Sequence, residues 1–122
     1  MPVRSLRSSV LNWPGSDEVI AAARAWATAQ AAACDGIVGI ACFGSYAQGD
    51  EGPGSDLDLI VIVETSSEPF ERRSMCFDAT DLPVPVDLLV YTRAEFVGIC
   101  GSDSRFAHTL RDEAVWLVGS GA

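Results

Sequence analysis

Between residues 16 and 33, apolar side chains recur every three to four positions, which is the spacing of one face of an α-helix. The positions that carry this repeat are Ile20, Ala23, Ala27 and Ala31. Asp17 and Glu18 follow the start, where negative charge is favourable at the positive end of the helix dipole. We therefore predict an amphipathic helix that begins near Ser16 and ends near Ala33, with Trp26 as an anchoring side chain.

Three short apolar runs have the length and composition of β-strands. Residues 37–43 are almost continuously apolar and are bounded by glycines, as in a buried strand. Residues 56–63 begin with polar–apolar alternation and continue as a β-branched run, which is typical of a central strand. Residues 86–91 follow two prolines, which keep the residues before them extended. The glycine-rich residues 44–55 are expected to form the loop between the first two strands.

The remaining segments favour helices. Residues 68–79 have a period closer to 3.6 than to 2, and Thr92 can cap a short helix that runs to about Cys100. Asp103 or Ser104 can cap a last helix that we expect to reach about Val118. The predicted order is helix, strand, strand, helix, strand, helix, helix, which places the chain in the α/β or α+β class with a small sheet flanked by helices. The length of 122 residues predicts a single domain over residues 1–122, with residues 1–14 as an irregular arm.

Composition and charge limit the classes of partner. Hydrophobic residues make up 48% of the chain and charged residues 20%, which is ordinary globular usage and excludes a fibrous or disordered class. The formal net charge is -9, and all eight basic residues are scattered arginines. A long nucleic acid is therefore not an expected partner, because its phosphates need a basic surface. Clustered acids suit a divalent cation better.

The cysteines and the lack of long apolar segments predict where in the cell the protein is located. The four cysteines are widely spaced and form no Cys-x-x-Cys pair, so we expect them to be reduced residues of the core. The first residues lack the apolar stretch of a signal peptide, and no segment has the roughly 20 apolar residues of a membrane span. The sequence accordingly predicts a cytoplasmic protein that does not contact a membrane.

Three aspartates are candidate metal ligands. Asp56 and Asp58 are two residues apart in a predicted strand, so their side chains leave the same face about 6.6 Å apart along the backbone. Two carboxylates held so close raise each other's pKa unless a cation lies between them. Asp87 lies in the third strand, in a run expected to be buried, where an unpaired carboxylate is costly. We interpret the three as ligands of magnesium, and two ions are expected; a solvated strand start and a salt bridge to an arginine are the alternatives.

Gly44 and Ser45 are candidate phosphate-binding residues. Gly44 lets the backbone approach a ligand closely, and Ser45 can open a helical turn whose free N–H groups point at an anion. A tight turn with no ligand is the alternative. His108, the only histidine, falls in the predicted last helix and is expected to be a surface or packing residue rather than a base.

These motifs together resemble the DNA polymerase β-type nucleotidyltransferase superfamily, and most closely the minimal nucleotidyltransferases of prokaryotes. The residues that carry the resemblance are Gly44-Ser45-x-Ala47-x-Gly49, Ser55-Asp56-Leu57-Asp58-Leu59 and Val86-Asp87-Leu88, within residues 37–91. The resemblance implies a mixed sheet flanked by helices and three aspartates that bind Mg²⁺. It also implies transfer of AMP from ATP, or of a nucleotide from another nucleoside triphosphate, to an acceptor hydroxyl. Some such proteins are antitoxin-like and pair with a HEPN-type toxin, which they adenylylate.

One departure from the family pattern leaves other functions open. Related loops carry arginines after the serine, but here the loop has none. Arg72, Arg73 or Arg93 would have to supply the charge, and the alternative for each is a solvated surface residue. A non-catalytic, antitoxin-like module that binds a partner or nucleotide without turnover is therefore the competing hypothesis. Transfer to a small molecule of the aminoglycoside type is a third. Because a chain of this length leaves little surface beyond a catalytic core, we expect a partner protein or a homodimer to complete the cleft.

Overall fold

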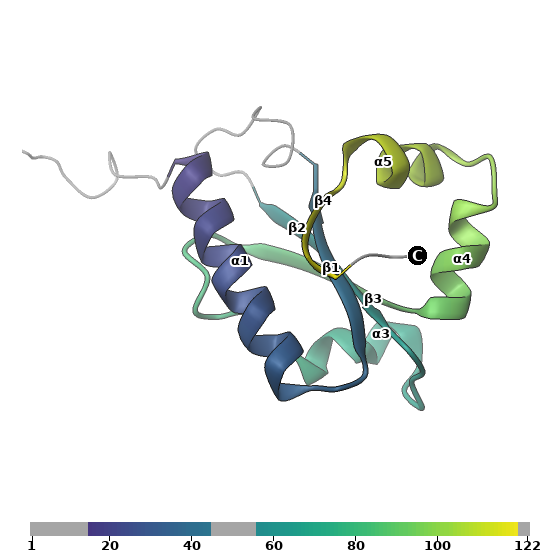
Figure 1. Ribbon diagram of the computed structural model, residues 1–122, viewed down its shortest axis with the longest axis horizontal. Helices are drawn as coiled ribbons and strands as arrows, with labels where there is room; N and C mark the ends of the chain where they lie inside the picture. The colour runs from purple at the N-terminus through teal and green to yellow at the C-terminus, as the bar shows by residue number, and fades with distance from the viewer. Residues whose placement is uncertain (1–14, 45–55, 120–122) are drawn as a thin grey trace, which may run out of the picture.

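The computed structural model describes residues 15–44 and 56–119, and it has the mixed α/β architecture expected from the sequence (Figure 1). The predicted arm at residues 1–14, the predicted loop after Gly44 and the candidate residue Ser45 lie outside the described residues. The described elements are α1 (Ser16–Ala33), β1 (Ile37–Phe43), β2 (Leu57–Val63), α3 (Phe70–Arg73), the 3₁₀ turn η2 (Ser74–Cys76), β3 (Val86–Thr92), α4 (Arg93–Cys100), α5 (Arg105–Glu113) and β4 (Val115–Gly119).

The four described strands form one sheet in the order β3-β2-β1-β4. β2 pairs in parallel with β3 and antiparallel with β1, and β1 also pairs antiparallel with β4. β2 is therefore an inner strand, and six of its seven residues are buried. This position explains why its sequence is a continuous apolar run after Asp58, since a strand covered on both faces has no solvent side.

Helices cover both faces of the sheet. α1 lies on one face, where Val19, Ala23 and Ala27 are fully buried against alternate residues of β2 that include Leu59. α4 and α5 lie on the opposite face, as Figure 1 shows, and pack there over a second cluster. That cluster is built on Ala41, Ile60, Ile62, Phe96 and Leu110. None of the helices in the described ranges is long and apolar enough to span a membrane.

Local sequence signals set the ends of the helices correctly in two cases. α1 begins at Ser16 and ends at Ala33, as predicted, and Trp26 is buried with its Nε1 donating a hydrogen bond of 2.8 Å to the Asp78 carbonyl. α4 starts after Thr92, which accepts a hydrogen bond from the Glu95 backbone N–H, while the Glu95 carboxylate accepts one from the Thr92 backbone. This reciprocal capping box confirms the predicted helix start.

The predicted last helix was wrong in its second half. α5 ends at Glu113, Ala114 is extended, and residues Val115–Gly119 form strand β4. The apolar residues of this segment fit a helical face as well as a strand, but the unpaired edge of β1 was available to satisfy their backbone groups. Long-range pairing with β1 therefore decided between two local patterns.

Two further predictions need correction. The helix expected over residues 68–79 is reduced to α3 and the turn η2, which together span Phe70–Cys76. Of the four free cysteines, only Cys42 is buried; Cys34 and Cys76 are exposed and Cys100 is half-buried, so the expectation of four core cysteines was wrong. Cys34 caps the C-terminus of α1 and Cys76 closes η2, and both positions face solvent because they end surface elements.

Candidate functional site

The parallel pairing of β2 with β3 brings two of the predicted aspartates together. Asp58 and Asp87 are direct partners in the register, each at the second residue of its strand. Neighbouring strands lie roughly 4.8 Å apart, and partners in a pair project from the same face. Asp56 immediately precedes β2, two residues before Asp58. The three residues therefore lie at the start of two adjacent strands, on the face of the sheet that α4 and α5 cover farther along.

The pKa of Asp58 is affected by this proximity. Partial burial raises the pKa of the Asp58 carboxyl, and the negative charges of Asp87 and then Asp56 raise it further. Asp58 is half-buried, whereas Asp56 and Asp87 are exposed. The expectation of a buried Asp87 was wrong, because β3 is an edge strand of the described sheet and its start remains open to water.

Gly44 approaches the Asp58 carboxylate from the neighbouring strand. Phe43, the last residue of β1, pairs with Asp58, and Gly44 follows it with a φ of 81°. A Cβ atom at this position would overlap the Asp58 Oδ2 atom. Glycine is required here for both reasons, since other residues rarely adopt this φ and none would leave room for the carboxylate.

The carboxylates fit magnesium by their chemistry, although their side chains are not gathered around one point. Within residues 15–44 and 56–119, no group of three or more His, Cys, Asp and Glu side chains is arranged to hold a metal ion. The aspartates nevertheless offer only oxygen ligands, which Mg²⁺ prefers. After burial, the negative charges of Asp87 and Asp56 also raise the pKa of Asp58, and a cation would relieve this repulsion. To bind one ion together with Asp58, the exposed side chains of Asp56 and Asp87 would have to rotate toward it.

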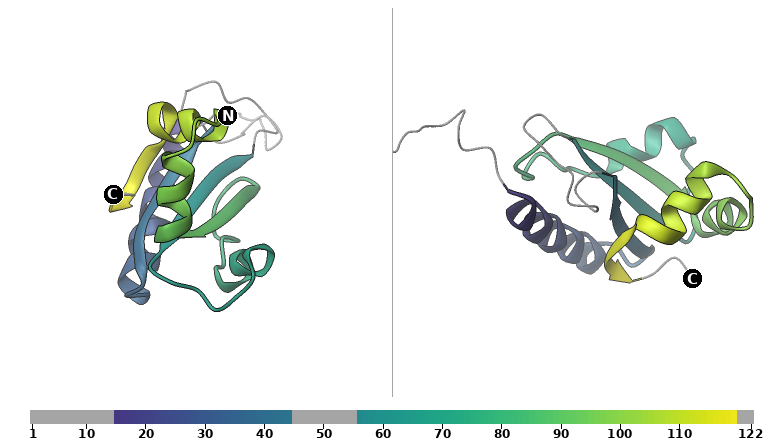
Figure 2. Two further views of the ribbon diagram at one scale, coloured as in Figure 1. Left: turned by 90° about the vertical axis from the view of Figure 1, so that its right-hand side faces the viewer. Right: turned by 90° about the horizontal axis from the view of Figure 1, so that it is seen from above.

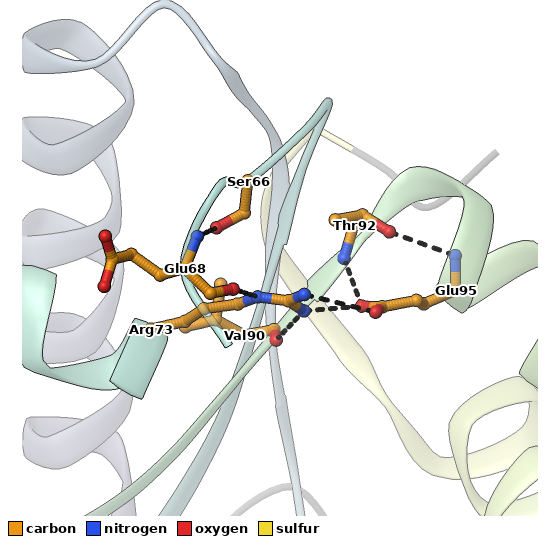
Figure 3. Close-up of polar contacts among 6 residues, drawn as sticks. All are labelled: Ser66, Glu68, Arg73, Val90, Thr92 and Glu95. Carbon is orange, nitrogen blue, oxygen red and sulfur yellow. Dashed lines mark hydrogen bonds and ion pairs between the residues drawn. The ribbon is translucent and has the colours of Figure 1, made fainter. Parts of the chain in front are cut away.

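Two of the arginines considered as phosphate ligands are engaged elsewhere. Arg73 is only 8% exposed, donates to the carbonyls of Glu68 and Val90, and forms an ion pair of 2.6 Å with Glu95 (Figure 3). Arg93 forms an ion pair of 2.8 Å with Glu64. Arg73 and Arg93 therefore act in the fold as ion-pair partners.

The remaining predicted candidates lie on the surface. Arg72 is exposed on α3. His108 is exposed on α5 and hydrogen-bonds Asp103 and Arg111, which agrees with the expected surface role.

The structure also shows a row of aromatic rings that the sequence pattern did not reveal. Phe43 contacts Phe106 at 5.9 Å between ring centroids, Phe106 contacts Tyr91 at 6.2 Å, and Tyr91 contacts Phe70 at 5.1 Å. The row begins at the β1 end beside Asp58 and crosses to α3. One feature of the sequence could have indicated part of this row. Side chains alternate along a strand, so Tyr91 shares a face with Asp87.

Comparison with known proteins was made for the sequence and for the fold. Residues 30–117, well over half of the chain, match the family described as nucleotidyltransferase domain. No sequence among the curated proteins matches the chain.

Among solved structures, a provisionally assigned nucleotidyltransferase from Sulfolobus solfataricus aligns with a TM-score of 0.59 and 16% identity, covering 93% of this chain and 89% of that one. Two toxin–antitoxin structures align with TM-scores of 0.46 and cover 88% of this chain and 75% of theirs. One contains AMP-PNP and is 18% identical; the other is a mutant of MntA–HpeT and is 16% identical. At these identities, the likeness to the Sulfolobus protein concerns the fold alone.

Proposed function

Because the chain belongs to the nucleotidyltransferase domain family, of the DNA polymerase β type, we propose that it transfers a nucleotide, AMP from ATP, to an acceptor hydroxyl in a magnesium-dependent reaction. The observation that supports this proposal most strongly is the in-register pairing of Asp58 with Asp87 beside the close approach of Gly44. Paired carboxylates at the start of neighbouring strands suit cation binding, and the adjacent glycine suits a phosphate.

Each candidate residue has a defined part in the proposed reaction. Asp56 and Asp58 hold magnesium, and Asp87 completes the set and accepts the proton of the acceptor hydroxyl. Gly44 and Ser45 hold the triphosphate through backbone N–H groups. Magnesium, when bound, neutralises the phosphate oxygens and makes the α-phosphorus more electrophilic.

The order of the strands gives the reaction a direction across the sheet. Gly44 follows β1, Asp58 lies on the next strand, and Asp87 lies on the edge strand beyond it. The pyrophosphate group therefore leaves toward Gly44, and the acceptor oxygen attacks the α-phosphorus from the β3 side, in line with the bond that breaks. A bond forms between the acceptor oxygen and the α-phosphorus while the bond to the β-phosphate breaks, and the acceptor proton passes to Asp87.

The acceptor in this proposal is a protein hydroxyl, for example on a HEPN-type toxin, because the resemblance to minimal nucleotidyltransferases implies such a partner. The start of the edge strand β3 is open, so a partner protein or a second copy of the chain can bring a hydroxyl to Asp87.

Calorimetric titration of ATP tests the proposal. We expect wild-type protein to bind ATP only with Mg²⁺, and the Asp56→Ala/Asp58→Ala variant to lose at least roughly tenfold in affinity because its metal ligands are gone. Asp35→Ala/Asp112→Ala, which removes two exposed acids outside the site, is the matched control and should bind as wild type does.

The competing function, a binding module without turnover, is favoured by one observation. Arg73 and Arg93 are held in ion pairs, so neither is poised for a triphosphate. Absence of Mg²⁺-dependent ATP binding in the wild type would refute the transferase proposal and support this alternative. ATP binding that survives in the Asp56→Ala/Asp58→Ala variant would refute the assigned metal ligands.

A further inference from the structure

A groove lies between α3, the end of β3 and α4, away from the aspartates but on their face of the sheet. Its volume is about 570 Å³, which falls in the range of small-molecule sites. It is lined by Phe70, Tyr91, Glu95, Gly98, Ile99 and Ser102. Mostly apolar walls with a few polar groups are the usual composition of a site that binds a small organic molecule.

Strand β3 carries one residue of each place, Asp87 at the aspartate site and Tyr91 in the groove. Asp87, Leu89 and Tyr91 alternate along β3 and therefore share one face. Four residues of strand separate Asp87 from Tyr91, a span of roughly 13 Å. This span is comparable with the reach of a nucleotide from its α-phosphate to the far edge of its base. In the proposed reaction the acceptor approaches across the strands, so we take the nucleoside to extend along β3.

The walls of the groove offer surfaces for stacking. Phe70 and Tyr91 lie 5.1 Å apart between centroids, and Phe70 is 40% exposed, one of three exposed large apolar side chains among the described residues. Gly98 adds no side chain to the opposite wall, and a Cβ atom there would meet nothing within 4 Å. A planar base can therefore enter against the two rings, a contact that aromatic side chains make with any base.

One polar group can select among bases. The Glu95 carboxylate accepts two hydrogen bonds from Arg73 and one from the Thr92 backbone N–H. A carboxylate has about four lone-pair positions, so among the contacts of the described residues Oε2 keeps capacity for one more donor. An exocyclic amino group, as on adenine, is a donor of this kind.

We propose that the groove between α3 and α4 is the nucleobase subsite, in which an amino-bearing base stacks on Phe70 and Tyr91 and donates to Glu95. The inference rests on the proposed nucleotidyl transfer and extends it by assigning where the nucleoside lies. A neutral ring suits the groove better than a phosphate does, because none of the described residues that line it is basic.

The test compares three probes, each with Mg²⁺: ATP, inosine triphosphate and inorganic tripolyphosphate. Titrations use the full chain as wild type, Phe70→Ala and Met75→Ala. Met75 is 76% exposed in η2 and does not line the groove, so it is the matched control for loss of an exposed apolar side chain. We expect Phe70→Ala to weaken ATP binding roughly tenfold and to leave tripolyphosphate binding unchanged, while Met75→Ala changes neither. Wild type should bind inosine triphosphate more weakly than ATP, since hypoxanthine lacks the amino group.

The outcomes separate this inference from the proposed function. Tripolyphosphate and ATP that bind wild type equally well, or ATP binding unchanged in Phe70→Ala, would overturn the subsite while the phosphate site stands. Equal affinities for ATP and inosine triphosphate would overturn the role of Glu95 as the acceptor. Failure of wild type to bind tripolyphosphate and ATP alike would instead overturn the proposed function, and the subsite with it.

Discussion

The contacts of two side chains, Asp58 and Arg73, come from several strands and helices at once. Asp58 depends on two strands: β3 places Asp87 beside it, and β1 places Gly44 against its carboxylate. Arg73 depends on three elements, because it donates to the carbonyl of Val90 in β3 and pairs with Glu95 in α4 while its backbone belongs to α3 (Figure 3). Substitutions at these positions should therefore change more than one element.

Gly44→Ala is expected to damage the aspartate site and the fold together. The φ of 81° strains an alanine, and the added Cβ atom would displace the Asp58 carboxylate. We expect a loss of about 1–2 kcal/mol in the free energy of unfolding and at least roughly tenfold weaker Mg²⁺-dependent ATP binding. Chemical denaturation and calorimetry would measure the two effects. Gly36→Ala, whose new Cβ atom would meet nothing within 4 Å, is the control; equal effects of both substitutions would contradict the explanation.

Glu95→Gln should destabilise the protein by leaving the buried Arg73 guanidinium without a charged partner. We expect a loss of about 2 kcal/mol, less than for a fully buried pair because water reaches Glu95. Glu64→Gln removes the partner of Arg93 on the surface and should change stability little.

The pH dependence of stability gives a second measurement of the same contact. The hydrogen bond from Arg73 lowers the pKa of Glu95 below its usual 4.5. A carboxyl group whose pKa is lowered by folding adds stability above its unfolded pKa and loses it as the pH falls through the folded value. Wild type should therefore lose stability below about pH 4.5, and Glu95→Gln should lose less over that range. Parallel pH profiles of the two proteins would argue against a contribution from this ion pair.

At the scale of elements, a capping residue fixes where α5 begins, but strand pairing decides where it ends. Ser104 caps α5 by accepting a hydrogen bond from the Ala107 backbone N–H. The same segment then leaves the helix at Ala114 and becomes β4, because β1 offers an unpaired edge. The start of this helix could be predicted from its cap, whereas its end depended on a strand more than seventy residues earlier in the chain.

Ser104→Ala should lower the stability of the protein by about 1 kcal/mol, since it leaves a backbone N–H of the first turn unsatisfied. Thr28→Ala is the matched control, because Thr28 lies inside α1 on the exposed side and its hydroxyl donates to the Arg24 carbonyl of the same helix. Alanine favours a helix interior, so the control should be neutral or slightly stabilising. Thermal unfolding of both variants compares them, and similar losses would show that the cap contributes nothing specific.

At the scale of the molecule, one strand joins two hydrophobic clusters. β2 contributes Leu59 to the cluster under α1 and Ile60 to the cluster under α4 and α5, and both side chains are fully buried. Figure 2 shows the helices on the two sides of the sheet from two further directions. Because the same backbone supports both clusters, neither can melt while the other stays ordered.

Leu59→Ala and Ile60→Ala should each lower the free energy of unfolding by about 3 kcal/mol, from lost burial and the cavity left behind. Both should therefore lower the midpoint of one cooperative transition. Val97→Ala, at a side chain that is 57% exposed, is the control and should have little effect. Circular dichroism and tryptophan fluorescence measured on the same denaturant series should coincide. Two separate transitions in either core variant would contradict the shared-strand explanation.

The elements from α1 to α4, apart from the length of α3, could be predicted from the sequence alone, and so could the proximity of Asp56 to Asp58. This was possible because helical period, β-branched runs and capping residues act over a few positions. Only the tertiary structure decided that β3 is an edge strand with an exposed Asp87, that residues Val115–Gly119 pair as a strand, and that Arg73 is an ion-pair partner. The row of rings from Phe43 to Phe70 also depended on the tertiary structure. Each of these features joins residues that are far apart in the sequence and that strand pairing and packing bring together.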